Sequence, residues 1–145
     1  MIETAIDEIL SNDTITKKIF LGVFARDELP FQPPYPSCLI FNTAPREHSG
    51  QHWLALYYDK NGICDFFDPY GMPALNFNMT SYLEKTSNHW KENKKRLQGL
   101  SHYCGHYCFL YLLFRARSKA TFFFRAFTSS LTNNDKKIKD LFKII

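Results

Sequence analysis

Three short apolar segments in the middle of the chain have the length and composition of β-strands. They run from Cys38 to Asn42, from His52 to Tyr58 and from Ile63 to Phe67. The last two are separated by Asp59-Lys60-Asn61-Gly62, in which Asn-Gly reaches positive φ at little cost. The pattern therefore predicts a β-hairpin beside a third strand.

Helical patterns lie on both sides of these strands. Apolar residues from Thr4 to Leu10 follow a helical period, and we predict further helices from Met79 to Lys95 and from Cys104 to about Arg117, then basic helical segments to the end. Four prolines between positions 30 and 36 predict an extended loop. Helices around a small mixed or antiparallel sheet make an α+β fold, and 145 residues predict one domain, 1–145.

The composition is that of a globular protein with a real core. Hydrophobic residues make up 45% of the chain and aromatic residues 17%, which excludes a disordered chain. The four cysteines, at positions 38, 64, 104 and 108, are too few and too scattered for a disulfide framework. We see no apolar run long enough to span a membrane and no secretory signal pattern, so we expect an intracellular protein that is not secreted.

Basic residues are concentrated in the C-terminal part of the chain. Residues 85–145 contain 13 Lys and Arg but only 3 Asp and Glu. Such an imbalance indicates a polyanionic partner, most plausibly a nucleic acid. The candidate DNA-binding residues are Lys94, Lys95, Arg96, Arg115 and Arg117. Solvated helix faces would give the same pattern, and we find no motif that reads a nucleic-acid groove.

Three residue types needed for thiol chemistry occur in a fixed order. Cys104 precedes Gly105 and an apolar helix, and a helix N-terminus favours a thiolate. His52 begins the central strand and Asp68 ends its hairpin partner, so the carboxylate can orient the imidazole. Asp65 competes for this role, but it differs from Asp68 by an odd number of positions and so points to the opposite face of a strand. The order predicts a cysteine nucleophile with a histidine base.

Gln98, six residues before Cys104, is a candidate donor to an oxyanion. Removal of one such donor typically slows a reaction by ~10²–10³. Taken singly, each of these residues has an ordinary explanation, such as a buried structural cysteine, an edge histidine or a surface glutamine. Cys104, His106 and Cys108 also resemble metal ligands, but on a helix His106 points away from the two cysteines. We therefore predict no metal site.

With these residues in view, the chain resembles the adenovirus-type cysteine proteases, the adenain family, which share a structural clan with the peptidases that process ubiquitin-like proteins. The resemblance runs from about Phe20 to Phe114. Its motifs are Phe20-Leu21-Gly22, Asn42-Thr43-Ala44 with Arg46-Glu47 and Gly50, His52-Trp53-Leu54-Ala55, Phe67-Asp68-Pro69-Tyr70-Gly71, Gln98-Gly99 and Cys104-Gly105. It implies His52 as general base, Asp68 as its orienting group, Cys104 as nucleophile at the start of a buried helix, and Gln98 as oxyanion donor.

The same resemblance implies a virus maturation endopeptidase that cuts capsid and core precursors after small residues, in the virion and the host nucleus. It implies no metal or small-molecule cofactor, and activation by DNA and a short viral peptide. Two departures change this picture. The family has Glu where Asp68 stands, whereas the related peptidases of ubiquitin-like proteins have Asp. No cysteine lies between Asp65 and Tyr103, so the cysteine that binds the peptide through a disulfide in the family has no match here. We expect a monomer without membrane contact. The alternatives are a hydrolase acting on ubiquitin or SUMO, and a catalytically silent DNA-binding domain.

Overall fold

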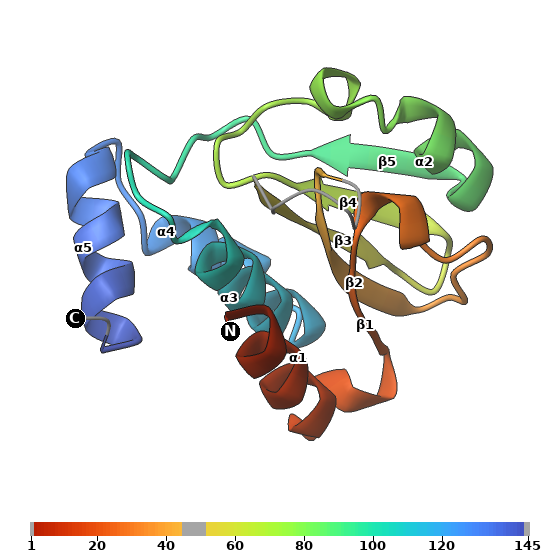
Figure 1. Ribbon diagram of the computed structural model, residues 1–145, viewed down its shortest axis with the longest axis horizontal. Coiled ribbons are helices and arrows are strands. Elements are labelled where there is room, and N and C mark those ends of the chain that lie inside the picture. Colours follow the sequence, from red (N-terminus) through yellow and green to blue (C-terminus); the bar gives the residue numbers. More distant parts are fainter. Residues whose placement is uncertain (1, 45–51, 144–145) are drawn as a thin grey trace.

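The fold is built on a five-stranded mixed sheet. The computed structural model describes residues 2–44 and 52–143, for residues 2–6 the backbone alone. The strands are β1 (Phe20–Phe24), β2 (Ser37–Asn42), β3 (Trp53–Tyr58), β4 (Ile63–Phe67) and β5 (His89–Glu92). They lie in sequence order, with antiparallel pairs at the centre and a parallel pair at each edge (Figure 1).

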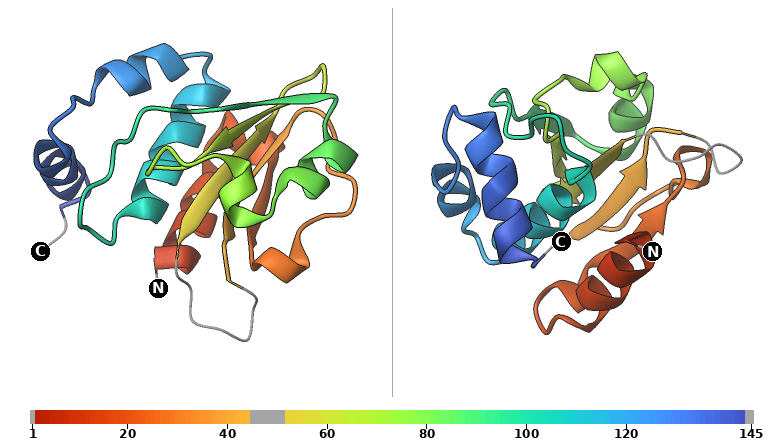
Figure 2. Two further views of the ribbon diagram at one scale, coloured as in Figure 1. Left: turned by 90° about the horizontal axis from the view of Figure 1, so that it is seen from above. Right: turned by 60° about the vertical axis from the view of Figure 1, so that its left-hand side comes forward.

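Helices cover both faces of this sheet. The helices are α1 (Ile2–Asn12), α2 (Thr80–Thr86), α3 (Cys104–Ala116), α4 (Ala120–Arg125) and α5 (Leu131–Leu141), and the 3₁₀ turns are Thr16–Lys18, Arg26–Glu28 and Ala74–Phe77. Residues of α1, α3, α4 and α5 share one core cluster, whereas α2 belongs to the cluster on the other face. Helix α3 lies between the sheet and α5 (Figures 1 and 2). The predicted α+β class is confirmed.

Burial on both faces explains the nearly continuous apolar sequence of the central strands. In β3, Ala55 and Tyr57 belong to the cluster around α3, and Leu54, Leu56 and Tyr58 to the cluster around α2. This strict alternation confirms the strand prediction. None of the helices in the described residues is long and apolar enough to cross a membrane.

The predicted helix from Met79 to Lys95 is wrong in its second half. Helix α2 ends at Thr86, Ser87 is extended, and the following residues form β5, which pairs with β4. Pairing across the sheet and the packing of Trp90 into the core fix this conformation, and both are long-range effects that override local propensity. Strand β1 was not predicted either. By contrast, the first helix, the helix from Cys104, the two basic helices and the three central strands are confirmed.

Candidate active site

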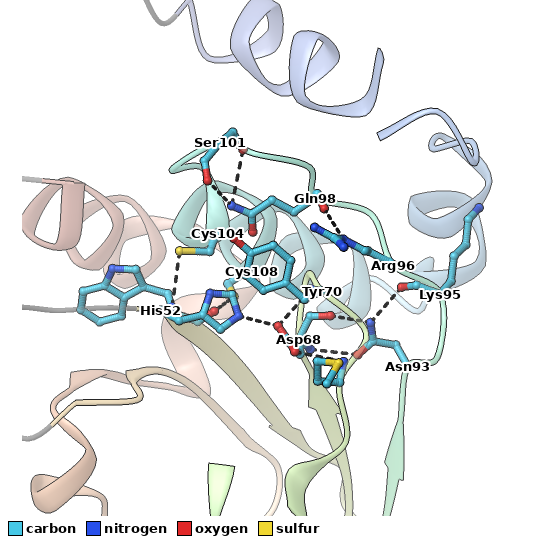
Figure 3. Close-up of polar contacts among 12 residues, drawn as sticks. His52, Asp68, Tyr70, Asn93, Lys95, Arg96, Gln98, Ser101, Cys104 and Cys108 are labelled. Atoms are coloured by element: carbon cyan, nitrogen blue, oxygen red, sulfur yellow. Dashed lines mark hydrogen bonds and ion pairs between the residues drawn. The ribbon is translucent and has the colours of Figure 1, made fainter. Parts of the chain in front are cut away.

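The sheet and helix α3 bring the candidate residues to one place. The antiparallel register of β3 and β4 pairs Ala55 with Phe67, so the residue before β3 and the residue after β4 lie at the same end of the sheet. These residues are His52 and Asp68. Cys104, the first residue of α3, lies at that end as well, where its sulfur accepts a hydrogen bond from the Trp53 N–H at 3.4 Å (Figure 3).

Asp68 is fully buried and bound to His52. Its Oδ1 lies 2.5 Å from His52 Nε2 and also accepts the Tyr70 N–H at 3.0 Å, while Oδ2 accepts the Met72 N–H at 3.0 Å (Figure 3). These amides belong to the tight turn that follows β4. The carboxylate is therefore fixed by its own chain, and it fixes the imidazole in turn. Because Nε2 faces Asp68, Nδ1 is the ring nitrogen left for the thiol.

A second support of Asp68 comes from a residue that the sequence reasoning missed. The Asn93 side chain accepts the Asp68 N–H at 2.8 Å and donates to the Asp68 carbonyl at 2.7 Å. Asn93 follows β5, which was predicted to be helical, so no local signal connected it with Asp68. The turn itself was visible in the sequence as Pro69-Tyr70-Gly71.

The environment of His52 favours the imidazolium ion. Burial opposes the charge, but the hydrogen bond to Asp68 and the interaction with Cys104 outweigh it and raise the pKa of His52 to about 9. The Tyr70 ring stacks on the imidazole with centroids 4.6 Å apart, and the Phe77 ring lies at 5.9 Å. These two rings, also missed from the sequence, shield the histidine from water.

The two cysteines at the start of α3 differ in their surroundings. Tyr103 provides no side-chain cap for this helix, and Cys104 stands where the free amides of the first turn favour an anion. Cys108, one turn later, is completely buried, and its sulfur donates to the Trp53 carbonyl at 3.4 Å. Burial raises the pKa of the Cys108 thiol well above its usual value. Cys108 is therefore part of the core.

Gln98 lies in the loop that leads to α3, and it is almost fully buried. Its side-chain Nε2 donates to the Ser101 carbonyl at 2.8 Å (Figure 3). Among the residues described, Oε1 of Gln98 has no hydrogen-bond partner. The side-chain amide of Gln98 is thus a hydrogen-bond donor beside Cys104, and in this structure it is bound to Ser101.

Four of the five basic residues predicted to contact DNA have partners within the protein. Lys95 donates to the carbonyls of Phe124 and Phe127, Arg96 donates to the Gln98 carbonyl, Arg115 pairs with Asp65, and Arg117 pairs with Asp13. Lys94 is exposed and forms no such contact in the described part of the chain. Asp65, the competitor of Asp68, is bound to α3 through Arg115 and Tyr111.

The side chains that could resemble metal ligands do not converge. His106 packs edge-on against the rings of Tyr103 and Phe142, away from Cys104 and Cys108. Within residues 2–44 and 52–143, no three His, Cys, Asp or Glu side chains are arranged to hold a metal ion.

Comparison with known proteins places the chain in a viral family. The sequence model of the adenovirus endoprotease family matches residues 20–137. The protein named "Protease" of human adenovirus E serotype 4 is 43% identical over 54 residues, which are 36% of this chain and 27% of that protein. The corresponding protein of human adenovirus A serotype 12 is 46% identical over 55 residues (37% and 23%), and that of equine adenovirus B serotype 2 is 36% identical over 70 residues (48% and 34%).

The matched segments thus span between 23% and 34% of these curated relatives. The resembling residues Arg46, Glu47 and Gly50 lie outside the described residues. The family match, in contrast, covers most of the chain and includes all four candidate catalytic residues. This chain belongs to the adenovirus endoprotease family.

Proposed function

We propose that the chain is a cysteine endopeptidase in which Cys104 is the nucleophile, His52 the general base and Asp68 the group that orients the base. The observation that carries this proposal is the buried 2.5 Å contact between His52 and Asp68, beside the sulfur at the start of α3. Membership of the endoprotease family supports it independently.

The reaction follows from this arrangement. His52 takes the thiol proton at Nδ1, and the Cys104 sulfur attacks the carbonyl carbon of the scissile bond. The resulting oxyanion accepts hydrogen bonds from the Cys104 N–H and from Gln98 Nε2, which exchanges Ser101 for the substrate. The imidazolium then gives its proton to the leaving amine, and water, deprotonated by His52, hydrolyses the thioester.

The substrates in this proposal are viral structural precursors, cut after small residues such as glycine in the virion or the host nucleus. Family membership supports this substrate class. Asp68 favours a second candidate, hydrolysis at the C-terminus of ubiquitin or SUMO, because the resemblance assigns aspartate to peptidases of that kind.

Activation by DNA and by a viral peptide completes the proposal. The positive charge of residues 85–145 supports the contribution of DNA. Apart from the proposed nucleophile Cys104, the free cysteines Cys38, Cys64 and Cys108 are fully buried, which does not favour a disulfide with a peptide. A peptide activator would therefore bind without a covalent bond.

A cleavage assay tests the enzyme. Glycine-containing peptides are incubated with the wild type, Cys104→Ala and Cys108→Ala, with and without DNA, and a fluorogenic ubiquitin C-terminal substrate is assayed in parallel. We expect peptide cleavage that Cys104→Ala abolishes and Cys108→Ala retains. Turnover of the ubiquitin substrate alone would support the second candidate. Salt-sensitive DNA binding without any hydrolysis would instead support the alternative that the chain is a catalytically silent DNA-binding domain.

A further inference from the structure

The loop that carries Gln98 is held by two adjacent residues of the C-terminal helix α5. Asn134 Nδ2 donates to the Leu97 carbonyl at 3.0 Å, and Asp135 Oδ2 accepts the Gly99 N–H at 3.0 Å. The two contacts fall on the residues immediately before and after Gln98. Helix α5 therefore forms hydrogen bonds to the backbone on both sides of the candidate oxyanion donor.

Asn134 is anchored as well as bound to the loop. It is buried, and besides Leu97 it binds Thr128, whose N–H it accepts at 2.9 Å and whose carbonyl it donates to at 2.8 Å. Its amide therefore makes three hydrogen bonds and has one orientation. The Leu97 carbonyl is held by a group that cannot easily turn away.

Asp135 connects the loop with the helix that begins at Cys104. Its second oxygen, Oδ1, accepts the hydroxyl of Tyr107 on α3 at 2.7 Å. A side chain at position 99 would bring its Cβ within 2.8 Å of Asp135 Oδ2, so glycine permits this close approach. Asp135 therefore forms hydrogen bonds both to the loop that carries Gln98 and to the helix that begins at Cys104.

The opposite side of the loop is also fixed. The Gln98 N–H donates to the Pro69 carbonyl at 3.1 Å, and Arg96 Nε donates to the Gln98 carbonyl at 2.8 Å. Pro69 adjoins Asp68, so the loop is held between the turn of the catalytic carboxylate and α5. The Gln98 amide then has a defined distance from the Cys104 sulfur.

We propose that Asp135 and Asn134 are positioning residues for Gln98, so that α5 sets the geometry of the oxyanion site; this inference rests on the proposed peptidase function. A merely structural role would stabilise the fold without regard to the chemistry. A positioning role and a merely structural role predict different effects of a substitution at Asp135 on kcat once Gln98 has been replaced.

The experiment is a double-mutant cycle between Asp135→Ala and Gln98→Ala, measured with a cleaved glycine-containing peptide. We expect Asp135→Ala to lower kcat at least about tenfold with KM nearly unchanged, because a displacement of the order of 1 Å costs up to ~10² in rate. In the Gln98→Ala background the same substitution should change kcat less than about twofold. Alkylation of Cys104 by iodoacetamide needs no oxyanion donor, so its rate should stay at the wild-type value.

Three variants serve as controls. Asp135→Asn keeps an oxygen for the Gly99 N–H and should retain most of kcat. Asp140→Asn makes the same chemical change on an exposed part of α5, where Asp140 pairs only with Lys136 among the residues described, and should have no effect. Gly99→Ala leaves the sequence of α5 unchanged, but its Cβ would lie 2.8 Å from Asp135 Oδ2 and 3.2 Å from Leu131 Cβ and so push the loop from α5. It should reproduce the loss of kcat even if Asp135→Ala fails to fold.

Two results would overturn the inference while leaving the enzyme intact. One is full kcat in both Asp135→Ala and Gly99→Ala. The other is a loss of kcat that is equal in the presence and absence of Gln98, accompanied by slower alkylation of Cys104. A wild-type chain that cleaves no peptide, with or without DNA, would instead remove the proposed function and this inference with it.

Discussion

At the scale of single residues, the ionisation of His52 couples the site to pH. The folded protein raises its pKa to about 9 from an ordinary value of 6.5, so folding favours the protonated ring. This stabilisation is fully present below pH 6.5 and is lost as the pH rises through 9. It amounts to at most on the order of 3 kcal/mol.

We therefore expect the free energy of unfolding to fall between pH 6.5 and 9 more steeply in the wild type than in His52→Gln. Chemical denaturation at several pH values in this range measures the difference. Parallel curves for the two proteins would show that His52 does not gain its proton affinity on folding.

Cys104 and Cys108 provide a second test at this scale. Both are buried, but Cys108 is enclosed by the core, its sulfur donates to the Trp53 carbonyl, and burial raises the pKa of its thiol. A thiolate is the reactive form, so iodoacetamide should modify Cys104 well before Cys108. Mass mapping of the alkylated peptides reads this out, with Cys104→Ala and Cys108→Ala as matched variants. Equal labelling of both residues would contradict the assignment of the nucleophile.

At the scale of secondary structure elements, the outcome of the sequence predictions depended on the range of the determining contacts. The hairpin from β3 to β4 was predictable because Asp59 and Gly62 form its turn locally, with Gly62 at φ +79° and the Asp59 side chain accepting the N–H groups of Asn61 and Ile63. Strand β5 was not, because its partner β4 lies more than twenty residues earlier in the chain. A short polar strand at a sheet edge has no period of its own to detect.

The residues of the site also divide into those that the sequence indicated and those that only the folded structure shows. Residue type and order indicated His52, Asp68, Gln98 and Cys104. The residues that hold them do not carry chemical signatures, and they come from distant elements, as Asn93 does after β5 and Asp135 does on α5. Their roles follow from contacts between chain segments, which only the folded structure supplies.

The turn after β4 makes the link between element and site testable. Gly71 has φ +73°, and a Cβ there would lie 3.0 Å from the Lys94 carbonyl oxygen and 3.1 Å from the Arg96 nitrogen. Gly71→Ala should therefore destabilise the protein by more than the ~1–2 kcal/mol of a left-handed alanine, and it should lower kcat by shifting Asp68. Denaturation and peptide cleavage measure the two effects.

Asn78→Ala is the matched control for this turn. Asn78 also has positive φ, at 56°, but its side chain is exposed. The Asn78→Ala variant should lose only the part of the free energy of unfolding that comes from the left-handed backbone conformation, and it should keep kcat. Equal losses in the two variants would mean that crowding at Gly71 is unimportant.

At the scale of the whole molecule, the charge imbalance is partly used inside the protein. Arg115 is the clearest case, because its Nε binds Asp65 at 2.7 Å and its guanidinium lies 4.3 Å from the centre of the Tyr57 ring. Lys94, by contrast, is exposed beside β5. A basic sequence therefore overstates the charge that is available to a polyanion.

This difference predicts separate effects of two substitutions on DNA binding and stability. For every phosphate that the protein no longer neutralises, the slope of log affinity against log salt should become shallower by about 0.9, and we expect such a change in Lys94→Ala with no loss of stability. Arg115→Ala removes the ion-pair partner of the partly buried Asp65, which keeps the hydrogen bond from the Tyr111 hydroxyl, so it should cost about 1–3 kcal/mol of stability and change the slope less. Fluorescence anisotropy with labelled DNA over a salt series and chemical denaturation give both quantities. A slope that both substitutions leave unchanged would contradict the proposed contribution of Lys94 to DNA binding, and an Arg115→Ala protein as stable as the wild type would refute the structural use of that charge.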